Sequence, residues 1–114
     1  MTRIIYHICR ADEWAAAARE GAYRGSDQDR ADGFIHFSTG AQVEDSARRH
    51  RAGQSGLVLV AVDADRLGDR LRWEPARRGG LYPHLYGALA VDEALSVRPL
   101  PLGPDGAHEF PALP

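Results

Sequence analysis

The apolar run from residue 57 to residue 62, Leu-Val-Leu-Val-Ala-Val, constrains the fold more than any other part of the chain. Successive side chains of a β-strand point to opposite faces of the sheet. A strand with this sequence therefore has to be covered on both faces. The run predicts a central strand of a sheet that is packed between other elements.

Two segments have the pattern of helices that could provide this cover. Residues 12–19 are rich in alanine, with acidic residues in the first turn, and Gly21 can end the helix in the left-handed conformation. A second helix is predicted to run to about Arg51. Thr39 and Gln42 have the spacing of a capping box, which marks the start of this helix. Its last turn is basic, which suits the negative end of the helix dipole.

The other elements are predicted to be short. Strand patterns cover residues 3–9, 33–38, 71–74, 81–89 and 96–100, and helical turns cover 65–71 and 91–95. The polar stretch 23–32 is predicted to be an exposed loop of the kind that closes over a site. The mixture indicates the α+β class, with two helices packed on small mixed or antiparallel sheets. We expect one domain over residues 1–114, with a core over about 3–100 and an irregular tail over 101–114.

Composition excludes several classes of function. The net charge of −2 indicates neither DNA nor an anionic membrane as a partner, and a protein partner is left open. All 14 basic residues are arginine, which excludes mechanisms that need a lysine, such as a Schiff base or a P-loop. Cys9 is the only cysteine, which excludes an intramolecular disulfide and a zinc site built on several thiolates. Without a signal-peptide pattern or a bilayer-spanning run, a cytoplasmic protein is expected.

Three histidines interrupt apolar runs and are the main indication of function. His7, His36 and His84 each lie in a strand pattern, and each buried neutral imidazole needs hydrogen-bond partners. A shared polar cleft would supply those partners more easily than three separate core sites, so we expect one cleft. Ser38 and Thr39 end the run 33–38 where a helix is predicted to begin, so their hydroxyls and the helix N–H groups could hold a phosphate or a ribose.

Four further residues are candidates for the same cleft. Glu74 adjoins a tryptophan, where a carboxylate could act as a general base or orient a ribose hydroxyl, and its alternative is an ion pair with a nearby arginine. Tyr86 could stack on a ligand ring or pack in the core. Arg77 and Arg78 precede two glycines and could clamp a phosphate from a loop or lie solvated at the surface.

The linked motifs resemble a known family. They are Ile-Tyr-His-Ile near the start, Glu-Trp followed by alanines, Asp-Gly-Phe-Ile-His-Phe-Ser-Thr, Trp-Glu, and Pro-His-Leu-Tyr-Gly. Their order over residues 4–100 is similar to the domain of unknown function 952 family of small bacterial proteins. That family looks like a compact relative of the ADP-ribosyltransferase fold, in which NAD or an ADP-ribosylated intermediate binds between two small sheets.

The resemblance also implies roles for particular residues. His7 resembles the first-strand group that contacts the ligand, and Ser38 with Thr39 resembles the second-strand pair beside the nicotinamide ribose. The late glutamate of the fold has no matched position, because Glu74 falls earlier in the order.

Three hypotheses of function stay open at this point. The first is a nucleotide-binding enzyme that acts on NAD or ADP-ribose by ribosyl or phosphate transfer, with His36, His7 and Glu74 as the catalytic candidates. The second is a non-catalytic module that binds a small ligand or a protein. The third is a metal site formed by His7, His36 and His84.

Overall fold

The run at residues 57–62 forms β5 (Leu57–Asp63), which lies inside a four-stranded sheet, as predicted. The computed structural model describes residues 3–76 and 79–113. The sheet order is β4-β1-β5-β9, with every pair antiparallel. Its other strands are β1 (Ile4–Arg10), β4 (Ser38–Thr39) and β9 (Ala94–Leu100).

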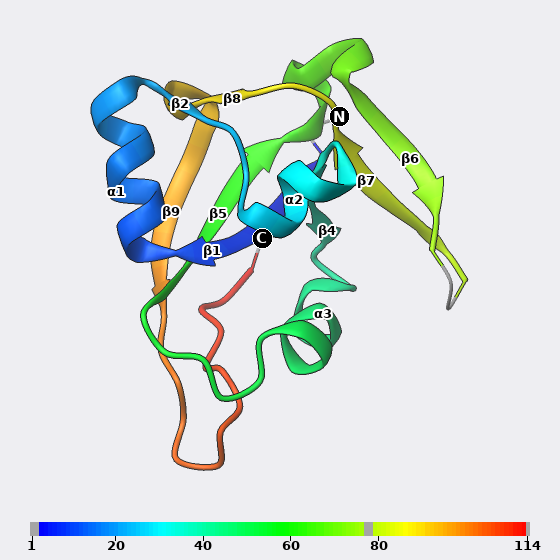
Figure 1. Ribbon diagram of the computed structural model, residues 1–114. Helices are drawn as coiled ribbons and strands as arrows, with labels where there is room; N and C mark the ends of the chain where they lie inside the picture. The colour runs from blue at the N-terminus through cyan, green and yellow to red at the C-terminus, as the bar shows by residue number, and fades with distance from the viewer. Residues whose placement is uncertain (1–2, 77–78, 114) are drawn as a thin grey trace.

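Two smaller sheets complete the β structure (Figure 1). The first has the order β3-β7-β6 and is antiparallel throughout; it consists of β3 (Ile35–His36), β7 (Leu81–Leu85) and β6 (Leu71–Pro75). The second pairs β2 (Ala22–Tyr23) with β8 (Leu89–Ala90). The molecule is a single compact α+β domain with antiparallel sheets.

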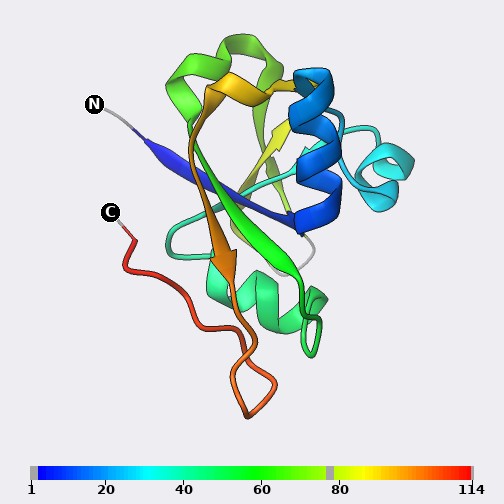
Figure 2. The ribbon, with the colours of Figure 1, turned by 90° about the vertical axis from the view of Figure 1, so that its left-hand side faces the viewer.

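Helices α1 (Ala11–Glu20) and α3 (Val43–His50) cover opposite faces of the four-stranded sheet. The core divides accordingly. Trp14 and Ala17 of α1 belong to the cluster that contains Ile5 and Val60, as Figure 2 shows for α1 beside β1 and β5. Val43 and Ala47 of α3 belong to a second cluster with the side chains of the other face, namely Tyr6, Ile8, Leu57, Leu59, Ala61 and Leu100. This two-sided burial is what the apolar run of β5 requires.

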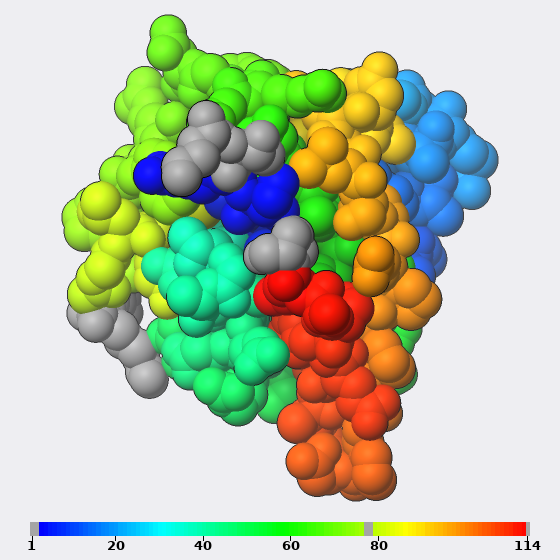
Figure 3. Space-filling model, turned by 180° about the vertical axis from the view of Figure 1, so that it is seen from behind, coloured from blue at the N-terminus to red at the C-terminus, as the bar shows by residue number. Residues whose placement is uncertain are grey.

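Two short 3-10 helices, η1 (Ala64–Arg70) and η2 (Val91–Glu93), connect the sheets where helical turns were predicted. Residues 101–113 are irregular apart from a bridge between Leu102 and His108. Figure 3 shows this tail lying between α3 and the start of β1, beside β9. No helix of the described residues is long and apolar enough to cross a membrane.

The prediction of a loop over residues 23–32 was wrong. The stretch contains α2 (Asp27–Asp32), whose N-cap is Ser26. The Ser26 hydroxyl accepts a hydrogen bond from the Asp29 N–H, and the Asp29 carboxylate accepts one from the Ser26 N–H. This reciprocal capping satisfies two N–H groups at the start of a polar six-residue helix.

The single strand predicted over residues 33–38 was also wrong. The chain forms β3, changes sheets at Phe37 and then forms β4. The Phe37 N–H still donates to the carbonyl of Pro83 in β7, whereas Ser38 pairs with Tyr6 of β1. The segment therefore links the three-stranded sheet to the four-stranded sheet.

The predicted capping box at Thr39 forms only in part. The Gln42 side chain accepts a hydrogen bond from the Thr39 N–H, but α3 begins four residues beyond Thr39 and its N-cap is Gln42. Thr39 instead pairs with Ile5 of β1, since its backbone belongs to the sheet.

Candidate functional site

The pairing of β3 with β7 places His36 directly opposite His84. Directly opposed residues of an antiparallel pair share a face, so that their side chains meet. Their ring centroids are 5.6 Å apart, and the Phe34 ring stacks on His84 at 4.0 Å and lies 4.6 Å from His36. Two histidines that are 48 residues apart in sequence (84 − 36) therefore form one cluster.

His36 lies between two carboxylates of α2. Its Nδ1 is 2.5 Å from Oδ1 of Asp29, and its Nε2 is 3.0 Å from Oδ2 of Asp32. Asp29 is buried, whereas the side chains of His36 and Asp32 are 41 % and 38 % exposed. The inner contact therefore fixes the ring, and the outer contact is a surface pair that a ligand could displace.

Asp29 is ionised despite its burial. Burial by itself would raise the pKa of Asp29, but the hydrogen bond of the His36 ring and the nearby His7 ring lower it. The backbone N–H groups of Ser26 and His36 also donate to this carboxylate. Together they bring the pKa of Asp29 to about 2.

His7 lies on the buried side of this cluster and hydrogen-bonds to its backbone. Its Nδ1 lies 2.6 Å from the His36 carbonyl oxygen, and its Nε2 lies 2.7 Å from the Tyr23 hydroxyl. A carbonyl can only accept, so Nδ1 carries the proton; burial lowers the pKa of His7, so the ring is neutral and Nε2 accepts from Tyr23. His7 is 4 % exposed with both nitrogens engaged.

These contacts give His7 a different place from the one that the resemblance implies. A ligand at the surface of the cluster cannot reach its ring nitrogens. His7 holds the backbone of His36, and its Nε2 lies 3.7 Å from the Asp29 carboxylate.

Glu74 joins the cluster from β6. Its Oε1 accepts hydrogen bonds from the Tyr86 hydroxyl at 2.7 Å and from Nδ1 of His84 at 2.8 Å. These two bonds lower the pKa of Glu74, so the carboxylate is ionised at neutral pH. Among the described residues Glu74 forms no ion pair with an arginine, although Arg72 lies nearby with its guanidinium 5.0 Å from the Tyr86 ring centroid. An ion pair of Glu74 with Arg77 or Arg78 stays a prediction, because those two residues lie outside the described ones.

Ser38 and Thr39 lie apart from the histidines. The Ser38 hydroxyl hydrogen-bonds to the Ser46 hydroxyl on α3, and Ser38 pairs with Tyr6, whose side chain belongs to the core cluster on that face of the sheet. His7 follows Tyr6 in β1 and therefore points to the other face. Arg77 and Arg78, the predicted phosphate clamp, lie outside the described residues.

The metal hypothesis gains no support from the geometry. Among the residues that the structure describes, no group of three or more histidine, cysteine, aspartate or glutamate side chains could hold a metal ion. His7 also has both ring nitrogens in hydrogen bonds within the protein.

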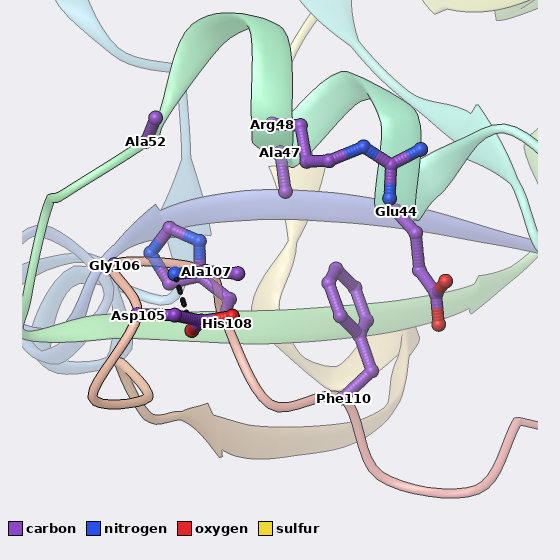
Figure 4. Close-up of a pocket in the computed structure, with 9 residues that line it drawn as sticks. All are labelled: Glu44, Ala47, Arg48, Ala52, Asp105, Gly106, Ala107, His108 and Phe110. Carbon is purple, nitrogen blue, oxygen red and sulfur yellow. Dashed lines mark hydrogen bonds between the residues drawn. The ribbon is translucent and has the colours of Figure 1, made fainter.

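Two hollows in the surface lie away from the cluster of His7, His36 and His84. One, of about 370 Å³, lies between α3 and the tail; Figure 4 shows Glu44 and Arg48 on the helix side of it, and His108 and Phe110 on the tail side. The other, of about 430 Å³, lies between the large sheet and the tail. The histidine cluster itself lies at the surface of the three-stranded sheet.

Sequence reasoning missed four members of the cluster: Tyr23, Asp29, Asp32 and Phe34. Asp29 had a detectable signal, because Ser26 and Asp29 have the spacing of a capping box. Tyr23 and Phe34 had none, because only the tertiary fold shows that they contact histidines.

Comparison with known proteins settles the family. The model of a family described as "Protein of unknown function (DUF952)" matches residues 8–97. The chain belongs to this family. Its sequence motifs had indicated the same family, and the matched region contains the three strands that carry His36, Glu74 and His84.

Solved structures of one relative share the fold. The crystal structure of protein CC0527 from Caulobacter crescentus has 44 % sequence identity and a TM-score of 0.90, and the match covers 93 % of each chain. The solution NMR structure of CC0527 has 45 % identity and a TM-score of 0.83, with 91 % of this chain and 90 % of that chain covered. No curated protein matches this chain.

Proposed function

We propose that this protein is an enzyme that binds a nucleotide of the NAD or ADP-ribose class at the histidine cluster and uses His36 and His84 for proton transfer. One observation carries the proposal. Two imidazoles lie side by side on paired strands, and each has its Nδ1 held by an ionised carboxylate, Asp29 or Glu74. Carboxylates that fix histidines in this way orient them for general acid–base catalysis.

The hydrogen bonds support different roles for the two rings. Nε2 of His36 faces Asp32 while Nδ1 faces Asp29. The His36 ring therefore lies between two carboxylates, and a ribose hydroxyl that displaced Asp32 could hydrogen-bond to its Nε2. The Nδ1 proton of His84 goes to Glu74. Its Nε2 has no hydrogen-bond partner within residues 3–76 and 79–113, so it can accept a proton.

The charges of the cluster suit a ribosyl-transfer step. When the bond between the nicotinamide nitrogen and C1′ of the ribose breaks, the electron pair leaves with nicotinamide and positive charge develops on the ribose. The ionised Glu74 would stabilise that charge. An attacking hydroxyl or water then forms the new bond at C1′, and its proton goes to Nε2 of His84. The ADP-ribosyltransferase relationship that the sequence motifs led us to expect would favour the same ligand class.

The test is incubation with NAD, with nicotinamide release followed by chromatography and ligand binding followed by thermal melting. NAD or ADP-ribose should raise the melting temperature of the parent protein, by linkage. We expect His84→Gln and His36→Gln to lower the rate of nicotinamide release by roughly a hundredfold or more, as loss of a general acid or base does. His108→Gln is the matched control, because His108 lies in the tail and bonds to the Gln54 carbonyl.

Binding without any turnover would replace the enzyme hypothesis with the non-catalytic ligand-binding module. If neither NAD nor ADP-ribose changes the melting temperature and no nicotinamide appears, the proposal is wrong in both its parts.

A further inference from the structure

The hollow of about 430 Å³ between the large sheet and the tail has a mainly apolar lining. Ile4 of β1 and Leu59 and Ala61 of β5 form its floor, and Leu113 of the tail closes one side. In Figure 3 the green surface of β5 is visible at this place, between β9 and the tail. The volume lies in the range of pockets that hold small molecules.

The hollow has one strongly polar side, formed by β9. Ser96 and Arg98 are two residues apart on this strand, so they share a face, and both line the hollow. Arg98 is exposed, and no carboxylate of the described residues forms an ion pair with it. The site therefore presents an apolar floor beside a guanidinium that forms no ion pair with any carboxylate of residues 3–76 and 79–113.

We infer that this hollow binds a small amphipathic carboxylic acid, with its apolar chain on the sheet and its carboxylate at Arg98. A guanidinium recognises a carboxylate through two parallel N–H donors, which makes this pairing geometrically specific. Ser96 can donate a further hydrogen bond to the same group. With one described cation in the lining, the site fits a single negative charge better than a polyphosphate. This site is separate from the histidine cluster and does not depend on the proposed function.

Three probes of equal chain length distinguish the head group: decanoate, decanol and decyltrimethylammonium, each below its micelle-forming concentration. Binding is followed by the methyl resonances of Leu59, Leu95 and Leu113 in two-dimensional NMR, since all three line the hollow. We expect saturable shifts with decanoate, binding of decanol that is roughly tenfold weaker, and no binding of the cation.

Two variants locate the site. Arg98→Gln should weaken decanoate binding by roughly tenfold and leave decanol binding unchanged, because it removes a charge-assisted hydrogen bond. Arg66→Gln, on the exposed side of η1, is the matched control and should bind decanoate like the parent protein. Ser96→Leu fills the hollow and should weaken both probes, and its thermal melting transition reports whether it is folded.

The inference is overturned if decanoate gives no saturable shifts, or if folded Arg98→Gln and Ser96→Leu both bind it as tightly as the parent. Vesicles of phosphatidylglycerol provide the last arm. Binding to these vesicles without binding of monomeric decanoate would show that the face recognises a lipid surface, which also overturns the free acid as occupant.

Discussion

A single buried carboxylate, Asp29, decides how the histidine cluster is arranged. It accepts hydrogen bonds from the Ser26 N–H, the His36 N–H and the His36 ring. It thereby joins the start of α2 to β3 and orients the His36 ring. Because its pKa is about 2, it remains ionised over the whole neutral range.

Replacing this carboxylate by its neutral isostere tests that role. Asp29→Asn presents one NH₂ group to a set of donors, so a buried hydrogen bond is lost, and we expect the free energy of unfolding to fall by about 1–3 kcal/mol. Urea unfolding measures this change, and the His36 ring resonances should move in NMR. Asp27→Asn is the control, because Asp27 is fully exposed and its pair with Arg30 lies at the surface. Equal stability of the two variants would contradict a special role for Asp29.

The residues of the site were predictable only in part. His7, His36 and His84 stood out because each interrupts an apolar run, and the structure brings them together. Their different places did not follow from the sequence, since His7 is buried beneath the cluster while His36 is exposed. The ligand-binding roles given to these residues stay predictions. Ser38 resembled a ligand-binding residue, yet it points to α3, because strand alternation at β4 could not be known before its partner was.

Among the elements, the turn into α2 brings the backbone of Gly25 close to the side chain of Asp29. Gly25 has φ +96°, and a Cβ at this position would lie 2.6 Å from Cβ of Asp29. Gly21, at the end of α1, has a similar φ of +89° with nothing within 4 Å of an added Cβ. The two glycines thus have a similar backbone conformation, but an added Cβ would meet a neighbouring side chain only at Gly25.

This pair of glycines gives a matched experiment. Gly21→Ala should cost about 1–2 kcal/mol, because a left-handed conformation is unfavourable for a residue with a Cβ. Gly25→Ala should cost more, since the added methyl also displaces Asp29, and it should alter the His36 resonances. Chemical denaturation of both variants measures the difference. A similar loss of stability in both would show that the contact with Asp29 is easily relieved.

An apolar pattern was enough to predict some elements, but not those that depend on polar contacts or on the choice of strand partner. β5 was confirmed because its apolar run requires burial on both faces, and α1 was confirmed because its alanines, its acidic first turn and Gly21 all favour a helix that ends there. α2 was missed because its sequence, Asp-Gln-Asp-Arg-Ala-Asp, has no apolar periodicity and its only buried side chain is a carboxylate. The break between β3 and β4 was missed because both parts look like strand, and only the partner differs.

For the whole molecule, the buried histidine makes stability depend on pH. The pKa of His7 is lowered in the native state, so below its ordinary value of 6.5 the unfolded chain binds more protons than the folded chain. We expect the free energy of unfolding to be level above about pH 7 and to fall as the pH drops below about 6.5. Asp29 adds a further loss as the pH falls from its ordinary 3.8 towards about 2.

Urea unfolding at pH values between 4 and 8 checks this slope. His7→Gln should flatten the part of the curve below about 6.5, whereas His108→Gln should leave it in place. If His7→Gln does not fold, NMR titration of the His7 ring in the parent protein gives the same answer. A His7 that takes up a proton at its ordinary pKa would contradict the expected direction.

The pairing of β3 with β7 also has a consequence for biosynthesis. His36 leaves the ribosome well before its partner His84, and β1 likewise leaves it well before its partner strand β5. During synthesis the apolar side chains of β1 therefore have no partner strand at first, and His36 has no facing histidine. The histidine cluster assembles only after β7 has emerged, so a chain truncated within β6 contains one of its two facing histidines and no assembled site.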